Sequence, residues 1–452
     1  MLLETNLNAL KKTDSYLASI IEQARADQSC RLLKAANGLP TAVAFDGGKP
    51  AFLHSRYDPV REAMSWAEVQ KIASVQALAL LGFGLGYHVR ALINRLQPDQ
   101  QLRVYQFGLG SFKRALESMN LVDLLLDHRL SLIVEDDQAV LAGDLAGLLK
   151  SGAQLLIHEP SLRAFPKGPL WETINEWRIK KASVIRFGRL LEDNYNANLP
   201  VLSSIPLIND YFGRLAGQPL LLAAGGPSLD EIIPYLHCKK ELFVLAVGTA
   251  LAPLMKAGIR PDMVIVTDPL PVIARQLTSI DAGTPLIILP TVSPAVISGR
   301  FSQLILALQE GFGPAEEMAE QRGAELIATG GSVSTTALDI AIRMGAKPIM
   351  LAGLDLAYPS GKMHATGTMH GDNVLWVQDE MVVTGVDGSP VVTTPVLNIY
   401  RRWIERRIAQ AEDLEVVNLS PSGACIANTK ALAPAFLLNY FVGGKQCNHV
   451  QI

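Results

Sequence analysis

Residues 221–230 read LLAAGGPSLD, an apolar run that passes through two glycines, a proline and a serine. A short, continuous apolar run that ends in glycine is typical of a strand buried on both faces of a parallel sheet. Pro227 suits the first turn of a helix, where its missing N–H would have no partner. The stretch therefore predicts a strand, a tight turn and a helix, which together open an α/β crossover unit.

The same alternation of apolar runs and helical segments continues on both sides of this stretch. Predicted strands follow it at residues 242–247, 263–267, 285–289, 303–306, 325–328 and 348–352, and precede it at 77–81, 102–106, 130–134 and 154–158. Strands spaced in this way indicate parallel sheets with crossover helices. We expect an α/β chain with two Rossmann-like parallel-sheet domains.

The expected domains have the following bounds. Residues 71–195 form the first Rossmann-like domain and residues 196–400 the central one. Residues 1–70 form a mixed helical and strand segment, with a helix at 7–26 in which apolar residues recur near helical spacing. Residues 401–452 form a helical segment that completes the central domain.

Composition narrows the class of protein. The chain has 452 residues, of which 49% are apolar and 18% are charged, and its formal net charge is −3. A near-neutral chain has no field that would favour nucleic acid or an anionic membrane as a partner. No apolar run approaches the roughly 20 residues of a membrane span, and residues 1–12 lack the order of a signal peptide, so we expect a cytoplasmic protein. The four cysteines lie far apart, which argues against a disulfide framework or a structural zinc site.

The turn at residues 225–228 is the first candidate binding site. Gly225 and Gly226 let the backbone approach a ligand closely, and Pro227 and Ser228 begin the following helix. Free amides and a hydroxyl at a helix N-terminus can bind a phosphate. The alternative is a plain strand-to-helix turn that Ser228 caps.

Two further strand ends carry candidate ligand-binding residues. Asp268 follows the strand at 263–267, where a side chain faces the usual ligand crevice. Its carboxylate can hold a ribose hydroxyl, a sugar hydroxyl or a metal, or it can simply cap a turn. Gly248 and Thr249 end another strand and could contact the same ligand.

A second glycine turn and a polar loop complete the candidate residues. Gly330, Gly331 and Ser332 lie between a strand and a helix, which predicts either a second anion cradle or a helix cap. The polar loop after the strand at 348–352 contains Asp355, Tyr358, His364 and Thr366. His364 can act as a general base near neutral pH, and Asp355 can orient it or bind a sugar. The alternative for His364 is an ordinary surface residue.

Two weaker signals point to structure as much as to function. Gly82, Gly84 and Gly86 follow a strand and resemble the glycine loop of methyltransferase-like Rossmann domains. At the end of the next strand Gln106 replaces the acid that would bind a ribose, which favours a structural role for this domain. A set of arginines at helical spacing either binds phosphate or carboxylate groups or forms a solvated helix face: Arg401, Arg402, Arg406 and Arg407.

Taken together, these motifs resemble the motility accessory factor (Maf) family, and the central domain is similar to archaeal 6-hydroxymethylpterin diphosphokinase. The resemblance covers most of the chain and is specific because the pieces occur in order. They lie at residues 82–88, 225–230, 246–251, 258–269, 330–334, 353–367 and 393–403. Residues 418–429 look like the closing segment of the family.

The resemblance implies a glycosyltransferase with a sialyltransferase-type central domain. It would transfer a nonulosonic acid, of the pseudaminic or legionaminic type, from a CMP-sugar to Ser or Thr of flagellin, which flagellum assembly and motility need. The residues from Gly225 to Ser228 would bind the donor phosphate, Asp268 and Asp355 would line the donor pocket, and His364 and Thr366 would lie beside it. CMP carries one phosphate, so no cofactor or metal is demanded, although Asp268 leaves a magnesium-dependent reaction open.

Two alternatives from other classes stay open. A pyrophosphokinase-like enzyme would use ATP, magnesium and a pterin, because pyrophosphoryl transfer needs charge neutralisation. A non-enzymatic assembly factor would bind flagellin without a nucleotide and without His364.

Overall fold

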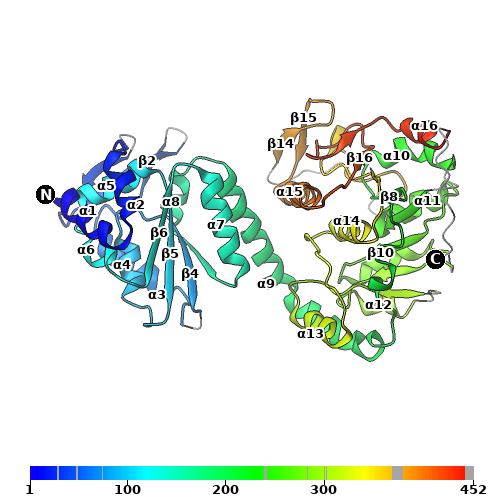
Figure 1. Ribbon diagram of the computed structural model, residues 1–452, viewed down its shortest axis with the longest axis horizontal. Helices are drawn as coiled ribbons and strands as arrows, with labels where there is room; N and C mark the ends of the chain where they lie inside the picture. Colours follow the sequence, from blue (N-terminus) through cyan, green and yellow to red (C-terminus); the bar gives the residue numbers. More distant parts are fainter. Residues whose placement is uncertain are drawn as a thin grey trace. The chain divides into compact units, whose positions relative to one another are not determined.

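The computed structural model describes residues 1–452 except 28–29, 47–48, 74, 239–241, 282, 300, 302, 369–379 and 443–452. The chain divides into two compact units, Met1–Trp177 and Arg178–Ile452 (Figure 1). Each unit contains a parallel β-sheet with helices packed against it. This arrangement confirms the predicted α/β class with two Rossmann-like sheets.

The first unit is built on a four-stranded parallel sheet with the order β6-β5-β4-β7. Its strands are β4 (Ala77–Leu81), β5 (Gln101–Phe107), β6 (Leu130–Glu135) and β7 (Gln154–Ile157). The helices that follow its strands are α4 (Tyr87–Ile93), α5 (Leu109–Ser118), α6 (Val122–Leu125), α7 (Gln138–Lys150) and α8 (Glu159–Ala164). Alternate residues of β4 face two different cores, because Leu78 and Leu80 pack in one cluster while Ala79 and Leu81 pack in another. Burial on both faces explains why the strand reads as a continuous apolar run.

The residues ahead of this sheet pack into the same hydrophobic core as its strands. They comprise α1 (Leu2–Thr13), α2 (Ser15–Gln23), an antiparallel sheet of β1 (Arg31–Lys34), β2 (Pro40–Asp46) and β3 (Lys49–Phe52), and α3 (Pro59–Glu68). The single helix predicted at residues 7–26 is wrong, because two helices occupy these residues. Asp14 between them is extended, and its carboxylate accepts the Leu17 amide at 2.8 Å. This cap starts a new helix instead of continuing the first.

The second unit is built on an eight-stranded parallel sheet with the order β12-β11-β10-β9-β8-β13-β16-β17. Its strands are β8 (Leu220–Ala223), β9 (Phe243–Val247), β10 (Met263–Val266), β11 (Leu286–Ile288), β12 (Leu304–Leu306), β13 (Ile349–Ala352), β16 (Val416–Asn418) and β17 (Lys430–Ala431). A hairpin of β14 (Met381–Thr384) and β15 (Pro390–Thr393) lies outside this sheet.

The helical elements of the second unit connect these strands. They are η1 (Ile208–Tyr211), α10 (Leu229–Ile232), η2 (Ile233–Cys238), α11 (Gly248–Lys256), η3 (Pro271–Leu277), α12 (Pro294–Ile297), α13 (Gly313–Arg322), α14 (Val333–Arg343), η4 (Pro359–Gly361), α15 (Pro395–Ala409) and α16 (Phe436–Val442). The strand predicted at 325–328 is wrong, because Ile327 makes only an isolated bridge to Gln309. The predicted closing segment at 401–452 is described as far as residue 442, and it supplies the strands β16 and β17 as well as helix; residues 443–452 lie outside the described residues.

The strand order of the second sheet reverses at β8. From β8 the chain moves through β9, β10, β11 and β12 to one edge, and then returns to β13 on the other side of β8. In open parallel sheets, ligands bind outside the carboxyl ends of the strands at such a reversal. The turn at residues 225–228 therefore lies at the switch point of this sheet.

The two units divide between Trp177 and Arg178, within helix α9 (Pro169–Leu202). The predicted boundary at 195–196 lies further along the same helix. The residues around that predicted boundary fasten the helix to the second sheet. The amide of Asn194 donates to the carbonyls of Pro269 and Thr291 at 2.9 and 3.1 Å. Asn198 donates in the same way to the carbonyls of Pro290 and Val292. The loops after β10 and β11 are thereby fixed to one side of α9.

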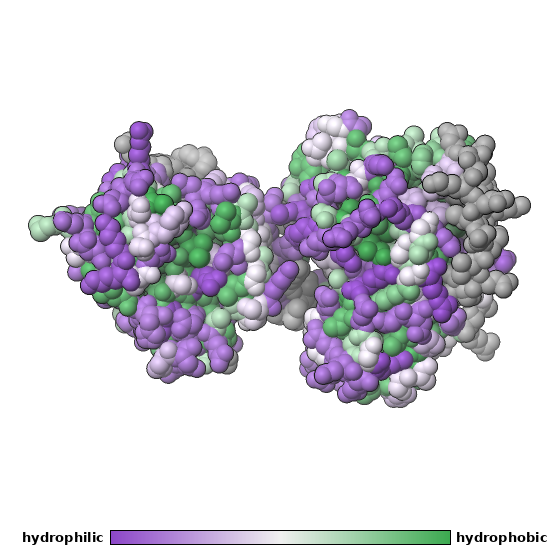
Figure 2. Space-filling model, viewed as in Figure 1, coloured by the Kyte–Doolittle hydropathy of each residue, from purple (hydrophilic) through white to green (hydrophobic). Residues whose placement is uncertain are grey.

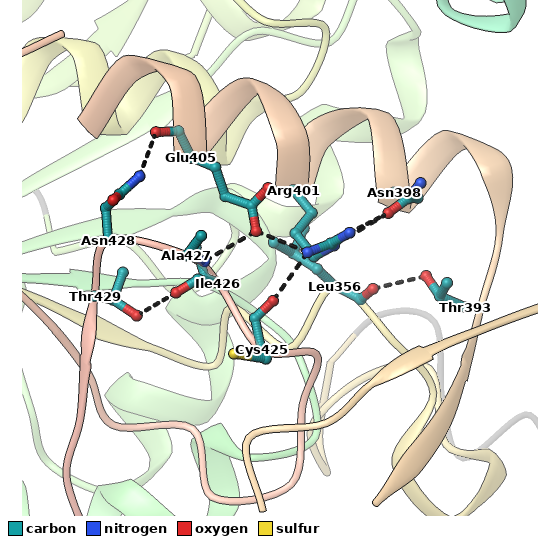
Figure 3. A network of polar contacts seen from close by, with 10 residues as sticks. All are labelled: Leu356, Thr393, Asn398, Arg401, Glu405, Cys425, Ile426, Ala427, Asn428 and Thr429. Carbon is teal, nitrogen blue, oxygen red and sulfur yellow. Dashed lines mark hydrogen bonds and ion pairs between the residues drawn. The ribbon is translucent and has the colours of Figure 1, made fainter. Parts of the chain in front are cut away.

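Helix α15 is fastened to the closing segment of the chain by a polar network (Figure 3). Arg401 donates to Glu405 at 2.7 Å, to Asn398 at 2.8 Å and to the carbonyl of Cys425 at 3.2 Å. Glu405 also accepts the Ala427 amide at 2.9 Å. Because each partner holds another, the network fixes residues 425–429 against the helix.

A second arginine of this helix is also engaged with protein. Arg407 pairs with the fully buried Asp339 at 2.6 Å, and Arg343 pairs with the other carboxylate oxygen at 2.8 Å. The Ala328 amide donates to Asp339 as well. Arg401 and Arg407 are therefore structural, and they fit neither the phosphate-binding alternative nor the solvated face.

The surface is mixed in character. Figure 2 shows hydrophobic residues interspersed among hydrophilic ones on the visible face, which is normal for folded proteins. Across the described part of the chain, no helix combines the length and apolar character that crossing a bilayer requires.

We expect the Glu405→Ala variant to be less stable than the wild type by about 1–3 kcal/mol, because the Ala427 amide loses its acceptor and Arg401 loses one of its three. The exposed Glu412→Ala variant is the matched control and should unfold like the wild type. Urea unfolding followed by circular dichroism measures both. Equal midpoints for the two variants would show that the network contributes nothing to stability.

Candidate functional site

A cavity of about 550 Å³ opens at the carboxyl edge of the second sheet. Ligand pockets in proteins commonly have volumes of about 300–1,000 Å³. Five residues that the sequence singled out line this cavity together: Gly248, Thr249, Asp268, Gly331 and Ser332. They come from the ends of β9 and β10 and from the start of α14, as the switch-point rule predicts.

The carboxylate of Asp268 lies on a wall that is held firmly in place. Its Oδ1 accepts the Leu270 amide at 2.8 Å, which fixes the turn after β10. The next residue, Pro269, is held through its carbonyl by Asn194. The half-buried Asp268 is thus presented to the cavity by a rigid turn and can accept hydrogen bonds from hydroxyl groups or hold a cation.

The start of α14 forms another wall. Ser332 and Thr335 make a capping box, in which the Ser332 hydroxyl accepts the Thr335 amide and the Thr335 hydroxyl accepts the Ser332 amide. The predicted helix cap is therefore present. The first amides of this eleven-residue helix have no intrahelical partner, and Val333 lines the cavity. An anion in the cavity would be stabilised by these amides and by the helix dipole.

The turn after β8 is already satisfied by protein groups. The Gly226 amide donates to the Gly353 carbonyl at 2.8 Å, and the Ser228 amide donates to Asp355 Oδ2 at 2.9 Å. The buried Ser228 hydroxyl donates to Ser420 at 2.9 Å. The helix that follows, α10, has only four residues. A phosphate predicted at this turn would meet groups that are bonded elsewhere, whereas the start of α14 leaves amides available.

Asp355 lies beneath this turn rather than on the cavity wall. It is 2% exposed, and a side chain at Gly226 or Gly423 would collide with it. Its Oδ1 has no hydrogen-bond partner among the described residues. Burial raises the pKa of the Asp355 carboxyl, with the hydrogen bond from Ser228 opposing the shift.

Two further predicted residues, His364 and Thr366, lie beside the turn after β8. His364 Nδ1 lies 3.2 Å from the Gly225 carbonyl, and Thr366 donates to Asp230 through both its amide and its hydroxyl. Tyr358 is half-buried. Gly225 connects the residues around the turn after β8 with those that line the cavity, because a Cβ at Gly225 would lie 2.6 Å from the hydroxyl of Thr249.

Sequence reasoning missed several residues that line the cavity. Gln276 comes from η3, Tyr400 from α15, and Phe187 from α9. Tyr400 lies within the segment 393–403 that carried the family resemblance, which was the one available signal. A single glutamine or phenylalanine far along the chain has no motif that could reveal it.

The glycine loop of the first unit is explained by packing. A side chain at Gly82 would collide with Ser161, one at Gly84 would lie 2.7 Å from His54 Nε2, and one at Gly86 would lie 2.8 Å from Leu121. Gln106 holds the loop by accepting the Phe83 amide at 2.8 Å. The predicted structural role fits these contacts.

Three buried histidines lie beneath this loop. One ring nitrogen from each of His54, His88 and His158 lies within 4.8 Å of the other two, which is close enough for the three to bind one metal ion if their lone pairs converged. His88 and His158 stack at 3.8 Å with only 12° between their planes, so their lone pairs do not converge. His54 Nε2 accepts the Leu85 amide at 2.9 Å. The geometry favours a stack of neutral rings that supports the loop.

Comparisons with known proteins found one matching family model and similar solved structures. Residues 193–361 match the family model described as 6-hydroxymethylpterin diphosphokinase MptE-like. A solved structure of a MAf glycosyltransferase from Magnetospirillum magneticum AMB-1 is similar over 98% of this chain and 77% of its own, with 16% identity and a TM-score of 0.49. The apo D-mandelate dehydrogenase of Rhodotorula graminis is similar over 73% of this chain and 88% of its own, with 13% identity and a TM-score of 0.16. No curated protein matches the sequence.

We expect acid to loosen the glycine loop of the first unit. Burial lowers the pKa of all three histidines, to about 4 for His88, while an unfolded histidine titrates near 6.5. Between these values the unfolded state binds more protons, so stability that is complete above pH 6.5 is lost as the pH falls toward 4. Hydrogen exchange of residues 77–93, corrected for intrinsic rates, should show this loss. This acid-induced loss of protection should be smaller in His88→Phe and unchanged in the control His128→Gln, which alters an exposed histidine. Protection that does not depend on pH in the wild type would contradict the expectation.

Asp355→Asn should separate a structural role from a catalytic one. The raised pKa means that the folded state favours the protonated carboxyl, so the wild type loses stability as the pH rises through that pKa. The asparagine side chain can still accept a hydrogen bond from the Ser228 amide, and it carries no charge. The difference in melting temperature, variant minus wild type, should therefore increase from pH 4 to pH 8. Asp355→Ala removes the acceptor and should cost about 1–3 kcal/mol. If Asn destabilises as much as Ala at pH 7, the charge itself is required.

Proposed function

We propose that this protein is a glycosyltransferase that binds a nucleotide-activated sugar in the cavity of the second unit. One observation carries the proposal: the start of α14 and the carboxylate of Asp268 line the same cavity at the carboxyl edge of a parallel sheet. A helix N-terminus stabilises phosphate, and a carboxylate accepts hydrogen bonds from sugar hydroxyls. A sugar linked to a nucleoside phosphate presents both groups.

The finer identity of the substrates follows from the family resemblance. The donor we propose is a CMP-nonulosonic acid of the pseudaminic or legionaminic type, and the acceptor is a Ser or Thr hydroxyl of flagellin. The hydroxyl oxygen attacks the anomeric carbon, the bond to the phosphate oxygen breaks, and CMP leaves with the electron pair. The amides at the start of α14 would stabilise the charge that develops on the phosphate.

The proton of the acceptor hydroxyl needs a base, and two side chains compete for this role. Asp268 lines the cavity, whereas His364 is held against the Gly225 carbonyl beside the turn after β8. The cavity location favours Asp268, and the resemblance favours His364. Loss of turnover with retained CMP binding in only one of Asp268→Asn and His364→Ala would decide between them.

A second candidate function rests on the family match at residues 193–361. A pyrophosphokinase acting on a pterin would transfer a pyrophosphoryl group from ATP, and the charge on three phosphates would require magnesium. Asp268 would then be the residue that holds the ion. This reading differs from the first in its need for both ATP and a divalent cation.

Nucleotide binding with and without magnesium tests these readings. We expect CMP to raise the melting temperature without magnesium, because a ligand that binds only the folded state stabilises it. Ser334→Asp adds a negative charge to the first turn of α14, which suits the helix but repels a phosphate. It should weaken CMP binding by roughly tenfold or more without lowering stability, while Ser334→Ala should bind like the wild type.

The outcomes separate the candidates. Stabilisation by ATP and magnesium alone would replace the glycosyltransferase with the pyrophosphokinase. Stabilisation by no nucleotide, together with flagellin binding, would favour the non-enzymatic assembly factor. Equal CMP affinity in the two Ser334 variants would remove the start of α14 from the phosphate site.

A further inference from the structure

The side chain of Gln276 lines the cavity, yet it is only 7% exposed. In the part of the chain that the structure describes, the side-chain amide of Gln276 makes no hydrogen bond to another residue. Buried amides almost always have partners, because an unmet donor or acceptor away from bulk water is unfavourable. A buried amide beside an open cavity therefore has its hydrogen-bonding capacity available to a ligand.

The surroundings of Gln276 define what kind of group can reach it. A Cβ at Gly248 would lie 2.6 Å from Gln276 Oε1 and 2.8 Å from Val266 Cγ1, so the glycine leaves room for the amide. Ile273, Leu270 and Phe187 add apolar and aromatic surface to the same cavity. The side-chain amide of Gln276 thus lies among largely apolar lining residues, whereas the Asp268 carboxylate and the start of α14 supply the charged and dipolar groups of the cavity.

A primary amide offers an acceptor and a donor side by side in one plane. Its natural partner is a flat group with an adjacent donor and acceptor, which is the pattern on the edge of a nucleobase. Phosphates and simple sugar hydroxyls do not present that planar pair. The apolar lining suits the faces of such a ring.

We propose that Gln276 binds the edge of the nucleobase and so positions the nucleotide in the cavity. The inference rests on the proposed binding of a nucleotide-activated sugar, and it assigns the base to the Gln276 side of the cavity and the phosphate to the start of α14. Gln276 is a binding and specificity residue in this assignment and takes no part in the transfer of the proton.

Gln276→Leu tests the assignment, with ribose 5-phosphate as a ligand that has the phosphate and the sugar but no base. We expect the variant to bind CMP at least about tenfold more weakly than the wild type, while its affinity for ribose 5-phosphate stays unchanged. Its melting temperature without ligand should equal or exceed that of the wild type, because no protein hydrogen bond is lost. Isothermal titration calorimetry and thermal unfolding measure both quantities.

Gln309→Leu is the matched control. Gln309 is similarly buried in the same unit and does not line the cavity. Its side-chain nitrogen donates to the Thr291 hydroxyl at 3.2 Å, while its side-chain oxygen has no partner among the described residues. This variant should lose stability and keep the wild-type ratio of CMP to ribose 5-phosphate affinity.

The failure of this inference is distinguishable from the failure of the proposed function. If the wild type binds CMP and Gln276→Leu binds it equally well, or weakens both ligands alike, the assignment of the base is wrong while the glycosyltransferase stands. If the wild type binds only ATP with magnesium, and Gln276→Leu weakens ATP but not inorganic tripolyphosphate, the base assignment stands and the glycosyltransferase falls. Absence of binding by every nucleotide overturns both.

Discussion

The hydrogen bond from the Ser228 amide to the buried Asp355 carboxylate is the contact on which the second unit depends. It joins the turn after β8 to the segment after β13, and these two strands flank the point where the strand order reverses. The glycines Gly226 and Gly423 are required there because any side chain would collide with Asp355. One oxygen of this buried carboxyl has no partner among the described residues, which is unfavourable by itself, so the close packing of three chain segments must hold the carboxyl in place.

This constraint limits which groups near the switch point can meet a ligand. Because the turn after β8 uses its amides and its serine hydroxyl to close the fold, it has little left to offer a phosphate. The adjoining cavity begins at Thr249, which contacts Gly225, and extends to Asp268 and the start of α14. The switch point therefore provides a rigid floor, while neighbouring strand ends provide the groups that can meet a ligand. Helix α9 strengthens this arrangement, since Asn194 clamps the loops that carry Asp268 and Thr291.

The sequence predicts those features of the fold and of the cavity that depend on neighbouring residues along the chain. Buried strands such as β8 and β10 are local apolar runs, and the rule that ligands meet strand ends then groups Gly248, Asp268 and Ser332 correctly. Contacts set by tertiary packing leave no local mark. Gln276 becomes part of the cavity only because Gly248 makes room for it, and His54 and His158 are brought together only by the tertiary fold. The strands β16 and β17 are too short to show a period.

The two units also show that a glycine-rich turn is a poor guide to binding by itself. In both units these glycines make room for protein side chains: Ser161 and His54 in the first, Asp355 and Thr249 in the second. What differs is the hydrogen-bonding capacity left over. In the first unit Gln106 uses its side-chain oxygen to accept the Phe83 amide, whereas in the second Gln276 lines the cavity and its side-chain amide makes no hydrogen bond within the described residues. A helix start and a side-chain amide without a partner among the described residues, both beside one cavity, are therefore a better indication of a ligand site than a glycine-rich turn is.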